Sequence, residues 1–229
     1  MYKRQILKPF NIPSDHLLID SEFYQAQMKC VFSEPIIEKR ILINKEAFIS
    51  NIRKKYSVDL SHLTDECQEH EKKVKRPVVF TETAVAEVIN AYDKILIEGF
   101  NVSEMRKLYE VLYDSSERNA KYTSWQSIKL IEAILAKLSL SVNNLDITSV
   151  MSPLYILHDY RILLDHLLSA DKISDTKQHI VATLGVQSFN DQESIYNEEI
   201  KRLNTLFNYL GVLSKSVSYT HLTLPTTSR

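Results

Sequence analysis

The residues best suited to chemistry lie in one short stretch, residues 153–169, with the sequence PLYILHDYRILLDHLLS. At 100° per residue, its apolar side chains fall on one face of a helix and its polar side chains on the opposite face. An imidazole exchanges protons near neutral pH and a guanidinium binds phosphate, so such groups together are suited to cleaving a phosphodiester bond. The polar face carries His158, Asp159, Arg161, Asp165 and His166.

The same polar face also has a purely structural interpretation. Arg161 and Asp165 are four residues apart, a spacing at which an exposed ion pair stabilises a helix by a few tenths of a kcal/mol. Ile162 lies in the middle of the polar face, which favours contact with another helix under either interpretation. From the residues alone, a nuclease site and a solvated helix face both remain open.

Residues 161–166, RILLDH, resemble the R-x4-6-H signature of the HEPN superfamily (higher eukaryotes and prokaryotes nucleotide-binding). The resemblance covers about residues 81–213 and implies an all-α bundle with the motif on an inner helix. HEPN proteins include metal-independent endoribonucleases of prokaryotic defence and toxin systems, in which two protomers of a dimer bring their motifs together.

Carried over to this chain, the resemblance implies a homodimer that acts on RNA without a metal or cofactor. Arg161 would bind the scissile phosphate and His166 would be the acid/base group, with His158, Asp159 and Asp165 in support. Ile162 departs from the family pattern, in which the residue after the arginine is commonly polar, often Asn or Asp. This departure keeps a second hypothesis open, a non-catalytic helical interaction or regulatory module of a larger multidomain protein.

Helical periodicity predicts how the motif is positioned. From residue 81 onward, apolar residues recur at helical spacing in six segments joined by short connections, which predicts an antiparallel helical bundle over residues 77–213. The three glycines, Gly99, Gly185 and Gly211, each stand where a helix is expected to end. The expected N-terminal caps are Thr81 or Thr83, Ser103, Ser124, Ser152 followed by Pro153, Ser174 and Asp191.

Residues 6–76 predict a smaller mixed α/β segment that is cut off at its start. Residues 16–19 and 36–43 are candidate extended stretches, and a helix is expected over residues 46–56. The charged residues 61–75 predict a solvated helix or a linker. His62, Cys67 and His70, with Cys30 upstream, are potential zinc ligands, but their spacing fits no standard zinc motif, and a surface helix with a free cysteine is the preferred interpretation.

Composition excludes several classes of protein. The chain has 229 residues, a net charge of −1, two cysteines and three glycines. No P-loop, dinucleotide-binding or G-x-S-x-G motif is present, and two cysteines do not make a disulfide scaffold. No apolar run approaches the roughly 18 residues of a membrane span, so we expect a cytoplasmic protein that does not enter the membrane.

The two ends resemble translated sequencing-adapter DNA. Residues 1–5, MYKRQ, and residues 217–227, VSYTHLTLPTT, correspond to one short adapter read from opposite strands. We therefore expect residues 1–5 and 217–229 to be adapter artefacts and exclude them from the fold argument. The remainder is then expected to be a fragment of a longer reading frame of metagenomic origin.

Overall fold

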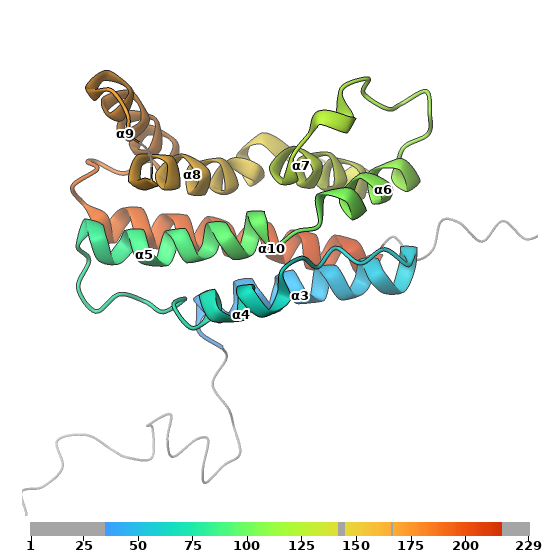
Figure 1. Cartoon of the computed structure of the whole chain (residues 1–229), viewed down its shortest axis with the longest axis horizontal. Helices are drawn as coiled ribbons and strands as arrows, with labels where there is room; N and C mark the ends of the chain where they lie inside the picture. Colours follow the sequence, from blue (N-terminus) through green and yellow to red (C-terminus); the bar gives the residue numbers. More distant parts are fainter. Residues whose placement is uncertain (1–34, 142–144, 166, 217–229) are drawn as a thin grey trace, which may run out of the picture. The chain divides into compact units, whose positions relative to one another are not determined.

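The structure, a computed structural model, describes residues 35–141, 145–165 and 167–216 (Figure 1). Within these ranges the chain is mainly helical, as the sequence predicts, and it forms no strand, unlike the mixed α/β segment expected before residue 77. None of the helices described is long and apolar enough to cross a membrane. The helices are α3 (Ile37–Tyr56), α4 (Thr64–Glu71), α5 (Glu82–Asp93), α6 (Val102–Leu112), α7 (Ser127–Leu138), α8 (Ile147–Asp165), α9 (Ala170–Leu184) and α10 (Gln192–Ser216).

The N-terminal segment is helical wherever the structure describes it. The extended stretch expected at residues 36–43 is wrong, because these residues form the first turns of α3. Ile41 begins a buried stripe that continues at helical spacing through Phe48, Ile49 and Ile52, so one period of 3.6 residues runs through the whole helix. The candidate strand at residues 16–19 lies outside the described residues.

The helices share one hydrophobic core. α3 and α10 pack along each other, and α10 also packs against α8, so the core continues across Pro77 (Figure 1). Asn51 of α3 donates from Nδ2 to the Gly211 carbonyl at 3.2 Å and to the Ser214 hydroxyl at 2.9 Å, both on α10. α8 contacts α5, α7, α9 and α10, which gives the predicted motif helix an inner position in the bundle.

Several helix ends follow the local sequence as expected. The Thr81 hydroxyl accepts from the Ala84 amide at 3.2 Å, which caps α5. Asp191 accepts from the Ser194 amide at 3.1 Å at the start of α10. Gly185 ends α9 with a φ of 71°, a left-handed conformation that glycine adopts without steric cost.

Other helix starts differ from the prediction. Asn101, and not Ser103, caps α6 by accepting from the Glu104 amide at 3.2 Å. Ser124 belongs to a 3-10 turn, and α7 begins three residues later at Ser127. α9 begins at Ala170, ahead of the expected cap at Ser174.

α8 begins at Ile147, six residues before the proline that was expected to open it. Pro153 has no amide hydrogen, so the Ser149 carbonyl lacks its usual donor four residues along the helix. The Ser152 hydroxyl donates to that carbonyl at 2.8 Å and takes the place of the missing donor. A proline at this position therefore does not interrupt the helix.

α5 continues directly into a π-helical turn, Lys94–Glu98. The turn buries three successive residues, Ile95, Leu96 and Ile97, and it ends at Glu98. Such turns are rare in proteins and occur frequently at functional sites. This one sets the position of Glu98 and of the connection to α6.

Gly99 directly follows the π-helical turn, at a helix end as predicted, whereas Gly211 does not end a helix. Gly99 has a φ of −70°, which is not left-handed, and a Cβ there would collide with the Ile95 carbonyl oxygen and lie 2.9 Å from Cys67 Sγ. Gly211 lies inside α10, where a Cβ would meet only the Asn44 carbonyl at 3.5 Å, an ordinary contact. Close packing therefore requires a glycine at position 99 but not at position 211.

Alanine substitution separates these two glycines. We expect Gly211→Ala to raise the free energy of unfolding by about 0.5–1 kcal/mol, because alanine has the higher helix propensity and its Cβ fits. Gly99→Ala should lower it by about 1–3 kcal/mol through overpacking against α4. Urea unfolding followed by far-UV circular dichroism measures both. A similar change in the two variants would contradict this account.

Candidate functional site

Arg161 lies on the face of α8 that packs against α5. Its Nη1 donates to Asp93 Oδ2 at 2.8 Å and to Glu98 Oε1 at 2.5 Å. Asp93 is the last residue of α5 and is fully buried, whereas the Arg161 side chain is 26% exposed. The arginine that the sequence assigns to phosphate binding is therefore held by two carboxylates of the same chain.

The electrostatics of this cluster follow from burial and pairing. Burial raises the pKa of Asp93 above its ordinary value, and the positive charge of Arg161 opposes that rise. Burial alone would lower the pKa of Arg161, but Asp93 and Glu98 outweigh it, and the pKa of the guanidinium is raised. The positive charge of Arg161 thus favours the ionised form of Asp93 inside the protein.

His158 lies one turn before Arg161 on the same face of α8. Its Nδ1 is 3.9 Å from Asp93 Oδ1, which is beyond hydrogen-bonding distance. Both atoms are buried, and neither has a hydrogen-bond partner in the described part of the chain. A small rotation of the imidazole would join them, so His158 and Arg161 share the buried carboxylate as their common neighbour.

Of the other predicted site residues, Asp159 does not join this cluster. Asp159 faces α9 instead, where its Oδ2 is 3.2 Å from His179 Nδ1. His166 and the side chain of Asp165 lie outside the described residues. Among the predicted residues whose side chains are described, His158 and Arg161 are brought together and Asp159 is not.

Sequence reasoning missed Asp93 and Glu98, which complete the cluster. Asp93 follows Val88, Ile89 and Tyr92 on the buried side of α5. A carboxylate among these apolar residues was the sequence signal that could have identified it. A buried charge requires a partner, which is Arg161. Glu98 had no comparable signal, because its position depends on the π-helical turn.

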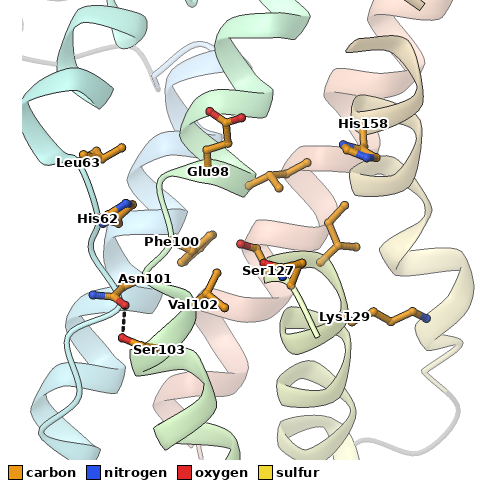
Figure 2. Close-up of a pocket in the computed structure, with 13 residues that line it drawn as sticks. His62, Leu63, Glu98, Phe100, Asn101, Val102, Ser103, Ser127, Lys129 and His158 are labelled. Carbon is orange, nitrogen blue, oxygen red and sulfur yellow. Dashed lines mark hydrogen bonds between the residues drawn. The ribbon is translucent and has the colours of Figure 1, made fainter. Parts of the chain in front are cut away.

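A cavity of about 690 Å³ adjoins the cluster, with His158 and Glu98 among its lining residues. Figure 2 shows side chains from several parts of the fold around it, including His62 and Leu63 before α4, Phe100 after the π-helical turn and Ser127 on α7. Cavities of this size are typical of small-molecule sites. The candidate site is thus a buried ion-pair cluster beside a largely apolar cavity.

The zinc hypothesis gains no support from the geometry around α4. Cys67 is buried, and its thiol donates to the His62 carbonyl at 3.6 Å. Burial raises the pKa of the Cys67 thiol, which disfavours the thiolate that binds metals. Within the described ranges, no three His, Cys, Asp or Glu side chains are arranged to hold a metal ion.

No protein-family model, curated protein or solved structure matches this chain. The HEPN resemblance therefore rests on residues 161–166 and on the helical pattern alone.

Removal of Arg161 tests its role in the cluster. We expect Arg161→Met to lower the free energy of unfolding by about 3 kcal/mol near pH 7.5, because Asp93 becomes a buried charge without its counter-charge. The pKa of Asp93, already raised by burial, then rises further, so Asp93 takes up a proton in the folded state as the pH falls. The deficit relative to the parent should therefore shrink towards pH 5.

Two further variants control this experiment. The double variant Asp93→Asn/Arg161→Met removes the buried charge and should recover part of the lost stability at pH 7.5. Lys201→Met removes an exposed cation and should change stability by less than about 0.5 kcal/mol. An Arg161→Met deficit that is the same at both pH values would contradict the proposed dependence of Asp93 on Arg161.

Proposed function

We propose that the described helices form a non-catalytic interaction module in which Arg161 fixes α8 against α5. The observation that carries this proposal is the pairing of Arg161 with Asp93 and Glu98. Two carboxylates compensate the charge of the guanidinium, so an RNA phosphate would have to compete with both of them. In this proposal, Arg161 holds α8 against α5 and does not bind phosphate.

A second copy of the chain is the partner we propose for this module. The apolar face of α8 is covered at Ile156, Leu157 and Tyr160, but Leu164 is 37% exposed and Leu167, just past the helix, is fully exposed. Apolar side chains exposed near one another favour association. The dimer that the HEPN resemblance implies would use this same end of α8.

Charge introduced at this end of α8 tests the dimer. We expect the parent to sediment as a dimer and Leu167→Glu to sediment as a monomer in analytical ultracentrifugation, because a glutamate would be desolvated in the interface. Leu140→Glu is the matched control, since Leu140 is also exposed but lies after α7. A monomeric parent, or a dimeric Leu167→Glu variant, would contradict the assigned interface.

A HEPN-like metal-independent endoribonuclease of a defence or toxin system is the second candidate. The observation in its favour is that His158 and Arg161 lie against one carboxylate beside a cavity. An imidazole next to a guanidinium supplies a proton-transfer group and an anion-binding group. In this proposal, an RNA phosphate draws Arg161 away from Asp93 and Glu98, and His166 is the acid/base group.

RNA cleavage decides between the two candidates. The purified chain is incubated with RNA in EDTA beside His166→Ala and the control His179→Ala, which alters an exposed histidine on α9. The non-catalytic proposal predicts no cleavage above the no-protein control. Cleavage in EDTA that His166→Ala abolishes and His179→Ala retains would overturn it. Cleavage that occurs only without EDTA would exclude the metal-independent mechanism.

A further inference from the structure

Three helices begin at the cavity beside His158. The residues that precede them all line it: Leu63 before α4 and Asn101 before α6, which Figure 2 labels, and Gln126 before α7. The first turn of a helix presents amide hydrogens without intrahelical partners and carries partial positive charge. Three such ends at one cavity make it favourable for an anion.

α7 presents its start to the cavity most completely. Four successive residues, Gln126 to Lys129, line the cavity. The side of a helix would present residues three or four apart, so this pattern indicates that the end of α7 faces the cavity. Gln126 makes no side-chain cap, whereas Asn101 caps α6. The first-turn amides of α7 are therefore not capped by a side chain.

Ser127 provides an independent observation at the same place. The residue is only 5% exposed and lines the cavity, yet its hydroxyl has no hydrogen-bond partner among the residues that the structure describes. Since Ser127 Oγ is not among the described buried atoms that lack a partner, the hydroxyl is accessible from the cavity that the residue lines. Ser127 thus offers an accessible donor on an otherwise buried residue, beside the uncapped turn of α7.

The charges in the lining define the kind of anion. Lys129 is the one Lys or Arg among the lining residues, and its Nζ donates to Glu132 Oε2 at 2.8 Å. Glu98, the acidic residue of the lining, is paired with Arg161. The charges of Lys129 and Glu98 are therefore both compensated by other side chains. The remaining binding groups, the helix ends and the Ser127 hydroxyl, suit a ligand with one negative charge better than a ligand with two.

The rest of the lining defines the body of the ligand. We propose that this cavity binds a small organic acid, with its carboxylate at the start of α7 against Ser127 and its apolar chain among the apolar lining residues. This proposal does not depend on the proposed interaction function. The apolar lining residues are Leu63, Ile97, Phe100, Val102 and Ile128.

The chain carries its own reporter for this binding. Trp125, the single tryptophan, directly precedes Gln126. Titration of the folded chain with octanoate should therefore change the tryptophan fluorescence saturably. Octan-1-ol, which has the same chain without the charge, and octyl phosphate, with a larger charge, should each bind at least tenfold more weakly.

Substitution of Ser127 locates the carboxylate. Ser127→Asp places a carboxylate in the first turn of α7, which is favourable for the helix, and should weaken octanoate binding at least tenfold. Ser124→Asp adds the same charge at an exposed position three residues earlier and should leave the affinity within twofold of the parent. Far-UV circular dichroism checks that each variant is folded.

A milder pair of variants keeps the test decisive if Ser127→Asp does not fold. Ser127→Ala should weaken octanoate binding about threefold or more, because it removes one hydrogen-bond donor. Ser139→Ala, a buried serine just past the other end of α7, should have no effect on the affinity. No saturable octanoate response in the parent, equal affinity for octan-1-ol, tighter octyl phosphate binding, or unchanged affinity in the Ser127 variants would each overturn the proposal.

Discussion

Asp93 is a carboxylate in the protein interior, where an ionised group requires a counter-charge close to it. Arg161 provides this charge from a helix 68 residues later in the chain. The pair fixes how α8 lies on α5, and α8 in turn contacts α7, α9 and α10. The ion pair therefore constrains the contact between α8 and α5 beside the cavity that His158 and Glu98 line.

The helical class of the fold could be predicted because its signals are local. The caps at Thr81 and Asp191 and the left-handed Gly185 involve residues within one turn of each other. The errors have equally specific causes. Pro153 is accommodated by the neighbouring Ser152 hydroxyl, and Gly211 lies inside a helix that continues beyond it. Neither outcome follows from the propensity of a single residue.

The candidate site was only partly predictable. Helical spacing identifies the face of α8 that carries His158 and Arg161, but it pairs Arg161 only with residues three or four positions away. Two of its partners, Asp93 and Glu98, come from another helix and from a π-helical turn that no local pattern indicates. The cavity was not predictable for the same reason, since it is formed where three separate helices begin.

The pairing of α3 with α10 has a consequence for how the protein is made. The two helices are joined through Asn51 and Gly211, which lie 160 residues apart in the chain. At about 5–20 residues per second, α3 waits on the order of ten seconds after its synthesis before α10 exists. During that interval the apolar stripe of Ile41, Phe48, Ile49 and Ile52 has no α10 to cover it. The nascent chain therefore passes through a stage in which it is open to chaperone binding and to aggregation.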